Sequence, residues 1–362
     1  MRRGDRHQEN PSISIPTRPV HGASGASPCS REGARAVLAA AVLLPLVAAW
    51  SMPAQARGPV AGEAFPVKPL RLVVPFPPGG GNDIVGRTIA QRLVEVIGQQ
   101  VVVDNRPGAG GTVGVSIAAQ AAPDGYTLLL GSVGMLAHNP ALKPDLPYSP
   151  LRDFTPVTLL VTSPMLLAVN PALPVKSVGE LVALARSSPG KYSYASAGSG
   201  SSLHMTAELF LRTAGVEMLH VPYKGANPAL VDLMSGRVDA IFSTMPPAIP
   251  QVKAGRIRAV AVTTRARSAA LPDVPTVLES GLRGFEVSNW QGIVVPARTP
   301  AARVRRLNRD LLATLALPGM AEALLAQGSE AAGGTPEAFG ALIRGEIETY
   351  TRLVKAAGIR AE

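Results

Sequence analysis

Residues 68–83 read KPLRLVVPFPPGGGND, and this stretch sets a pattern that the rest of the chain repeats. The β-branched run RLVVPF (71–76) predicts a short buried strand. A glycine-rich turn follows. The apolar residues of 84–97 then recur at helical spacing, and Gly98 marks the expected end of the helix. A strand, a glycine turn and a helix are the building unit of an α/β fold.

The chain continues this alternation to about residue 296. Further strands are predicted at 101–105, 126–132, within 157–170, and at 192–197, 218–223, 239–244, 257–264 and 286–296, with helices near 112–121, 201–214 and 228–235. Ser177 with Glu180, and Thr276 with Glu279, have the spacing of capping boxes. Strands that alternate with helices predict an α/β architecture with largely parallel sheets.

The C-terminal third is predicted to be helical. Thr299-Pro300 and Thr335-Pro336 each pair an N-cap residue with a proline at the first helical position. Apolar residues between Phe339 and Val354 recur at helical spacing and form a stripe that suits a core-facing helix.

Residues 31–56 have the features of an export signal. Two arginines precede an apolar run from Ala36 to Trp50, and Ala54-Gln55-Ala56 has the small-residue pattern of a cleavage site. The apolar run is shorter than the roughly 20 residues that span a bilayer. We therefore expect residues 1–56 to be a leader that is cut after Ala56, and the mature protein to be exported. A buried core helix is the alternative interpretation.

The composition excludes several classes of protein. The chain has 35 Lys and Arg against 25 Asp and Glu, a net charge of +10, and loss of the leader leaves +7. These basic residues are scattered without interleaved aromatics, so no nucleic-acid partner is expected; small anions or a membrane surface fit better. The single cysteine, Cys29, lies in the leader, so the mature chain has no disulfide or thiolate. About 300 residues usually form two domains.

Four glycine- or serine-rich turns before predicted helices are candidate anion sites. They are PFPPGGGND (75–83), NRPGAGGTVG (105–114), SAGSGSSLH (196–204) and VPYKGANPA (221–229). The first N–H groups of a helix lack partners and attract anions, and glycine allows close approach. In the last turn we expect Asn227 to cap a helix that begins at Pro228. A plain tight turn explains any one of these loops, but four together favour an anion site at the carboxyl ends of the strands.

Motifs for nucleotides, metals and nucleophilic catalysis do not fit. The glycines of 108–114 are spaced one residue too far apart for a dinucleotide fingerprint, and no loop leads into Gly-Lys-Ser/Thr. The mature chain's histidines, His138, His204 and His220, form no zinc-binding pair, so no metal is expected. There is no Gly-x-Ser-x-Gly elbow, although the sequence leaves a Ser–His–Asp triad open.

Some side chains have two interpretations. Asp83 precedes Arg87 by four residues, which predicts an ion pair. A free carboxylate would repel a bound anion, so Asp83 either points away as a cap or receives an ammonium or hydroxyl group of the ligand. His204, in the first turn of a helix, either faces the ligand or is buried, and Trp290 either walls the cleft or fills the core. His220 is expected in the core.

The chain resembles the periplasmic solute-binding receptors of tripartite tricarboxylate transporters, often called Bug-type receptors, in a series of motifs that follow one another in order. They are KPLRLVVPFPPGGGND, VVVDNRPGAGGTVG, PDGYTLLLGS, SAGSGSSLHMTAELF, HVPYKGANPAL, LMSGRVDAIF, LPDVPTVLESG and NWQGIVVPARTP. The resemblance runs from about Pro66 to the C-terminus. Two positions depart from it: Arg298 replaces a small residue, and Asn82 stands where Thr or Ser is common.

The resemblance implies a two-domain Venus-flytrap fold of the type II periplasmic binding protein kind. Domain I would combine 66–165 and 266–362, domain II would be 166–265, and two strands would cross near 166 and 265. The ligand would lie between the 76–83 and 197–202 loops. The expected ligand-binding residues are Phe76, Pro78, Gly79, Gly80, Gly81, Asn82, Asp83, Ser132, Ala197, Gly198, Ser199, Gly200, Ser201, Ser202, His204, Tyr223 and Lys224.

The resemblance also implies a function. A monomeric receptor in the periplasm would capture a small carboxylate (a di- or tricarboxylate, an acidic amino acid or an aromatic acid) and pass it to the membrane components of a tripartite transporter. No cofactor and no enzymatic activity are expected. Two alternatives stay open: a receptor that only signals to a sensor protein, and a secreted hydrolase that uses His204 and a loop serine.

Overall fold

The computed structural model describes residues 65–359. The predicted leader, its cleavage site after Ala56 and Cys29 lie outside this range. Within it, no helix has both the length and the apolar character needed to cross a membrane.

The first half of the sheet is built around β1 (Leu70–Val74). This strand pairs in parallel with β2 (Val101–Asn105) and β3 (Thr127–Ser132). β3 pairs antiparallel with β9 (Ser288–Pro296), which pairs antiparallel with β4 (Phe154–Val169). Successive side chains of a strand point to opposite faces. Nearly all residues of β1 and β3 are buried, so both faces of this half of the sheet are covered.

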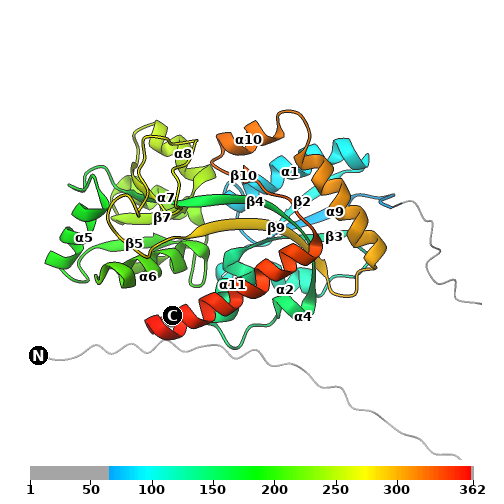
Figure 1. Cartoon of the computed structure of the whole chain (residues 1–362), viewed down its shortest axis with the longest axis horizontal. Coiled ribbons are helices and arrows are strands. Elements are labelled where there is room, and N and C mark those ends of the chain that lie inside the picture. Colours follow the sequence, from blue (N-terminus) through cyan, green and yellow to red (C-terminus); the bar gives the residue numbers. More distant parts are fainter. Residues whose placement is uncertain (1–64, 360–362) are drawn as a thin grey trace, which may run out of the picture. The chain divides into compact units, whose positions relative to one another are not determined.

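Helices cover the two faces of the first half (Figure 1). One face packs against α1 (Gly81–Ile97), α9 (Ala301–Leu315) and α10 (Met320–Ala326). The other packs against α2 (Thr112–Ala119) and α11 (Pro336–Ala357). Short helical turns complete this half: η1 (Ala109–Gly111), η2 (Gly134–His138), α3 (Asn139–Leu142) and α4 (Pro150–Asp153).

The second half of the sheet has β5 (Ser193–Ser196) between its parallel neighbours β6 (Leu219–Pro222) and β7 (Ala240–Thr244). β7 and β8 (Arg258–Val262) both pair antiparallel with β4. The core on one face includes residues of α7 and α8, and the core on the other includes residues of α5 and α6. These helices are α5 (Val178–Ser187), α6 (Ser202–Ala214), α7 (Ala226–Ser235) and α8 (Met245–Lys253).

β4 joins the two halves, because its residues 154–164 pair with β9 and its residues 165–169 pair with β7. The chain returns to the first half beside it. The N–H group of Thr263 donates to Met165 O, and the N–H group of Val287 donates to Thr263 O, just before β9 begins at Ser288. Val277, Phe285 and Val287 pack in the core of the second half. The segment after residue 265 therefore stays with the second half up to about residue 287.

The sheet is mixed, so the prediction of largely parallel sheets is wrong. β4 and β9 are long strands that run in opposite directions between the halves, as Figure 1 shows, and β4 has antiparallel partners along its whole length, including β10 (Glu330–Ala331). Alternation of strands and helices along the sequence reports local βαβ units. It does not show that one strand serves two sheet halves.

Local signals at helix ends are mostly confirmed. Ser177 and Thr335 accept the expected N–H groups as N-caps of α5 and α11, and Gly98 ends α1 in the left-handed conformation. Two caps were wrongly predicted. α9 begins at Ala301 with Pro300 in the N-cap position and no side-chain cap, and the Thr299 hydroxyl donates to Pro296 O. α7 begins at Ala226 after Gly225, which leaves the side chain of Asn227 free for another contact.

Candidate ligand-binding site

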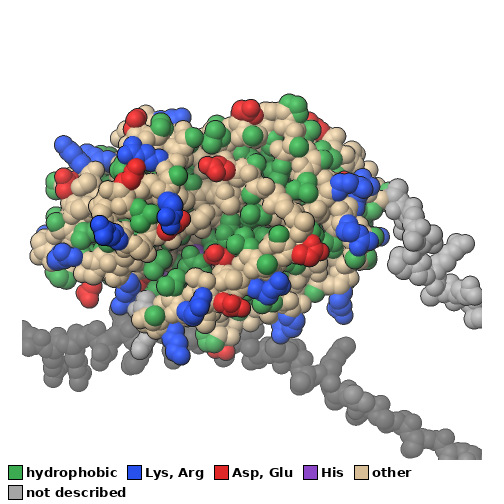
Figure 2. All heavy atoms as spheres, in the orientation of Figure 1, with side chains coloured by type: hydrophobic (Ala, Val, Ile, Leu, Met, Phe, Trp, Pro, Cys, Tyr) green, Lys and Arg blue, Asp and Glu red, His purple; other side chains and the backbone are tan. Residues whose placement is uncertain are grey.

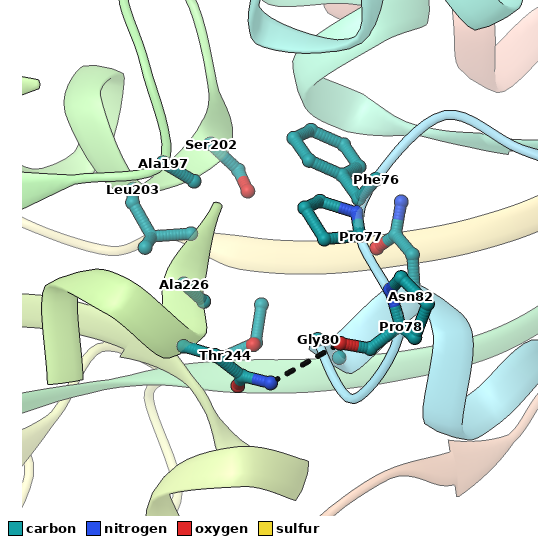
Figure 3. A pocket seen from close by; sticks show the side chains of 12 residues that line it. Phe76, Pro77, Pro78, Gly80, Asn82, Ala197, Ser202, Leu203, Ala226 and Thr244 are labelled. Carbon is teal, nitrogen blue, oxygen red and sulfur yellow. Dashed lines mark hydrogen bonds between the residues drawn. The ribbon is translucent and has the colours of Figure 1, made fainter. Parts of the chain in front are cut away.

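A small cavity lies where the two halves of the sheet meet (Figure 3). The loop after β1 and the start of α1 line it from the first half, and the ends of β5 and β7 with the starts of α6 and α7 line it from the second. The lining residues are Phe76, Pro77, Pro78, Gly80, Gly81, Asn82, Ala197, Ser202, Leu203, Ala226, Asn227 and Thr244. Its volume of about 30 Å³ leaves space for about one or two water molecules. We call it the first cavity.

Glycines allow the two halves to approach this closely. A Cβ atom at Gly79 would lie 2.6 Å from Asn227 Nδ2, and one at Gly81 would lie 2.5 Å from Thr244 Oγ1. Asn227 Nδ2 also donates a hydrogen bond to Pro78 O at 3.2 Å, drawn as the dashed line in Figure 3. The side chain expected to cap α7 thus bridges the two halves.

Asp83 fixes the loop after β1. Its carboxylate is 2% exposed and accepts hydrogen bonds from the Gly79 N–H group (2.8 Å), Arg87 Nε (2.9 Å) and Asn105 Nδ2 (2.9 Å). Burial alone would raise the pKa of Asp83, but these donors outweigh it, so the pKa is lowered. The expected ion pair with Arg87 is confirmed, and Asp83 turns toward its own loop instead of the cavity.

The first turn of α1 presents unpartnered donors to the cavity. Its N-cap, Gly80, provides no side-chain cap, and the N–H groups of Gly81 and Asn82 have no hydrogen-bond partner among residues 65–359. The amide nitrogen of the Asn82 side chain is also buried without a partner. This end of α1 can therefore receive an anion or another acceptor.

The serine loop (196–204) satisfies most of its own donors. The N–H groups of Gly198, Gly200 and Ser201 bond to Ser196 Oγ, His204 Nδ1 and Gly198 O respectively. Ser202 and Leu203 of α6 line the first cavity, and their N–H groups have no hydrogen-bond partner among residues 65–359. The N–H group of Ser199, a residue that lines the second cavity described below, likewise has no partner in the described part of the chain.

His204 holds the serine loop through a hydrogen bond to its backbone. It is 2% exposed, lines neither of the two cavities between the halves, and its Nδ1 accepts the Gly200 N–H group at 3.3 Å. Burial, and then the charges of His220 and Lys143, lower the pKa of His204 to about 3. His220 stacks on it at 4.3 Å, and its Nε2 lies 2.7 Å from the Oγ of the fully buried Ser196.

A second cavity of about 370 Å³ lies beside the first and shares Phe76 and Ala197 with it. The remaining lining comes from η1 and Gly108, from Gly198 and Ser199 of the serine loop, from Pro222 to Lys224, and from Lys143. The glycine turn at 105–114 therefore meets the serine loop at this cavity. Among residues 65–359 no group of three His, Cys, Asp or Glu side chains is arranged to hold a metal ion.

The structure gathers most of the predicted residues at these two cavities. Those that line one or both are Phe76, Pro78, Gly80, Gly81, Asn82, Ala197, Gly198, Ser199, Ser202, Tyr223 and Lys224. Those that line neither are Gly79, Asp83, Ser132, Gly200, Ser201 and His204. Ser132 is buried at the end of β3 opposite Gln291, and Trp290 packs on Phe339 in the core.

Sequence reasoning did not select Thr244, Leu203 or Lys143 as site residues. Thr244 ends a strand that the sequence predicted, and this position at the carboxyl end of a strand was the available signal. Nothing in the sequence placed Lys143, which follows the four-residue helix α3, beside the serine loop.

Comparison with known proteins identifies the family of this chain. The model of a family described as "Tripartite tricarboxylate transporter family receptor" matches residues 85–359. The chain belongs to this receptor family. Its mixed α/β fold is the periplasmic binding-protein fold expected from the motifs.

Three solved structures are similar to this receptor. A protein from R. palustris, Rpa4515 with adipate, is 38% identical with a TM-score of 0.79, covering 82% of this chain and 99% of its own. The periplasmic binding protein BugD is 36% identical with a TM-score of 0.79, covering 82% and 100%. MatC from Rhodopseudomonas palustris with bound malate is 34% identical with a TM-score of 0.77, covering 80% and 100%. The family and fold are those of periplasmic binding proteins.

Proposed function

We propose that the receptor binds a small carboxylate in the first cavity, between the first turns of α1 and α6. The observation that carries this proposal is that residues whose backbone N–H groups have no hydrogen-bond partner line one cavity from opposite halves: Gly81 and Asn82 on one side, Ser202 and Leu203 on the other. Two helix N-termini that face each other favour a negative group between them. Adipate and malate, found in two similar receptors, are both dicarboxylates.

Neutral side-chain donors would complete the hydrogen bonding of the carboxylate. No charged side chain is among the residues that line the first cavity. Asn82 Nδ2 and Thr244 Oγ1 are buried there without a hydrogen-bond partner. A buried polar atom without a partner costs about 1–3 kcal/mol, so a carboxylate that pairs with both atoms would recover this energy.

The cavity as it stands is too small for such a ligand to enter, which favours opening and closing of two domains. We place domain I at 66–164 and 288–359 and domain II at 165–287, because the strands cross at these points. Small-angle scattering should then show a larger radius of gyration without ligand. An unchanged radius at saturation, with the free protein shown to be open, would contradict this.

The wider role follows from the family. We propose that residues 1–56 export the chain, that it works in the periplasm as a monomer, and that it delivers its ligand to the membrane components of a tripartite transporter. A purely signalling receptor differs only in its partner. A hydrolase is disfavoured because His204 Nδ1 accepts a backbone N–H group and Ser196, which His220 contacts, is fully buried.

Calorimetry with adipate and malate on two threonine variants tests the binding site. Thr244→Val keeps the shape of the side chain but removes the hydroxyl that faces the cavity. It should lower affinity about tenfold or more, the effect of losing one hydrogen bond to a charged acceptor. Thr206→Val is the matched control, since the Thr206 hydroxyl is equally buried and unpartnered but lines neither cavity.

Three results would contradict the proposal. Equal affinities for Thr244→Val and Thr206→Val would remove Thr244 from the site. Failure of the wild type to bind any of a panel of mono-, di- and tricarboxylates would exclude a carboxylate receptor. Chemical conversion of a bound acid, seen by mass spectrometry of the recovered ligand, would replace the receptor with an enzyme.

A further inference from the structure

Two lysines from opposite halves face the second cavity. Lys143 follows α3 in the first half, and Lys224 lies between β6 and α7 in the second. Lys143 is half-buried, and its Nζ donates to Ser199 O at 3.0 Å, whereas Lys224 is exposed. Each ammonium group therefore retains donors for another acceptor.

Neither lysine has a carboxylate partner. No Asp or Glu among residues 65–359 forms an ion pair with Lys143 or Lys224, although Arg side chains elsewhere are often paired. Burial lowers the pKa of Lys143, and no nearby carboxylate offsets this. Burying a cation without a counter-charge is unfavourable, so a bound anion would relieve the cost.

The two cavities are neighbours with different chemistry. They share Phe76 and Ala197, which line both. On one side of this apolar divider the donors are neutral, and on the other side they are cationic. A ligand that passes Phe76 would meet backbone and amide donors at one end and two ammonium groups at the other.

We propose that Lys143 and Lys224 form a distal anion subsite, which selects an elongated dicarboxylate whose other carboxylate lies between α1 and α6. This inference rests on the proposed function for the position of the first carboxylate. Because the lysines belong to different halves, a second carboxylate between them also joins the halves. The apolar surface of Phe76 suits a methylene chain between the two charged ends.

Calorimetry with straight-chain dicarboxylates from succinate to suberate, each paired with its half-amide, tests the subsite. The half-amide keeps one carboxylate and the length of the chain but loses the distal charge. We expect one chain length at which the diacid binds wild type about tenfold tighter than its half-amide. Lys224→Met should remove this preference by lowering the affinity for the diacid about tenfold, to about that for the half-amide.

Lys253→Met is the matched control, because Lys253 is an exposed lysine near the end of α8 that lines neither cavity. It removes the same charge and should keep the preference for the diacid. Lys143→Met should weaken both ligands, since it also removes the bond to Ser199 O.

The outcomes separate this inference from the proposed function. If diacid and half-amide bind wild type equally at every length, there is no distal subsite but the carboxylate receptor stands. If Lys253→Met and Lys224→Met reduce the preference equally, the effect is general charge attraction and the subsite is wrong. If no acid binds wild type at all, the proposed function itself fails.

Discussion

The 76–83 loop and the serine loop (196–204) do the same task with different chemistry. Each leaves a strand, opens a helix and presents unpartnered N–H groups to the first cavity. The 76–83 loop is fixed by a carboxylate within its own half, through Asp83. The serine loop is fixed by hydroxyls and a neutral imidazole, and from the opposite half by Lys143.

The difference shows how the proposed anion site can lie close to a carboxylate. The negative charge of Asp83 is compensated by Arg87, and its oxygens accept three hydrogen bonds from within its own half. It therefore positions the donors of α1 without strongly repelling the ligand. The serine loop contains no charged side chain. Its Gly200 N–H group donates to the neutral His204 Nδ1, so protonation of His204 would break this hydrogen bond.

Removing the charge of Asp83 should have the largest effect. Asp83→Asn breaks the ion pair with Arg87 and can bring an amide donor against the Gly79 N–H group. We expect the free energy of unfolding to fall by about 2–4 kcal/mol, as measured by urea denaturation. Asp104→Asn is the control, because Asp104 is paired to Arg71 and Arg106 nearer the surface and should cost about 1 kcal/mol or less. Equal losses would mean that Asp83 is no more than a surface charge.

The contributions of the two loops to stability should be lost in different pH ranges. The folded pKa of His204 is lowered to about 3, so as pH drops the unfolded chain protonates His204 before the folded chain does. The free energy of unfolding therefore falls below about pH 6.5, by up to about 1.4 kcal/mol per pH unit. The pKa of Asp83 is also lowered, but because Asp83 is an acid its contribution is complete above about pH 4 and is lost as pH falls through the folded pKa.

Urea denaturation from pH 7 to pH 4 separates these contributions. His204→Gln keeps an acceptor for the Gly200 N–H group and should remove part of the slope between pH 6 and pH 4. The buried His138, whose pKa burial also lowers to about 3, would keep the rest. A slope identical to that of wild type would show that His204 does not control the serine loop.

The approach of the two halves should tolerate a methyl group at Gly80, the N-cap of α1, but not at Gly81, the first residue of α1. Gly81→Ala would place Cβ against Thr244 across the cleft, so affinity for the ligand should fall about tenfold while each half still folds. Gly80→Ala is the control, since its φ is −74° and its nearest neighbour would be 3.4 Å away. Calorimetry that finds equal affinities would mean that the two halves do not close in this arrangement.

Capping of the two helices should give the smallest effect. Ser201 Oγ accepts the His204 N–H group at 3.3 Å at the start of α6, whereas Gly80 at the start of α1 has no side chain to cap with. Ser201→Ala should therefore cost about 1 kcal/mol of stability, measured by thermal unfolding. A loss as large as that of Asp83→Asn would show that the hydroxyl holds the whole serine loop.

The sequence by itself determined the local structure of this protein. Apolar periodicity located α1 and its neighbouring strands, Gly98 marked a helix end, and the spacing of Asp83 and Arg87 predicted their ion pair. These features depend on residues within about one helical turn of each other, so the sequence carries their physical cause directly. The order of the glycine-rich motifs also identified the family.

Only the tertiary structure decided what meets at the site. Thr244, Asn227 and Lys143 come from separate elements, and their contacts with the 76–83 loop and the serine loop require β4 to join the two halves. Which N–H groups remain unpartnered depends on side chains such as His204, whose burial is set by packing of α6. Hydrogen bonds between distant segments follow from the three-dimensional path of the chain, and no local pattern in the sequence records that path.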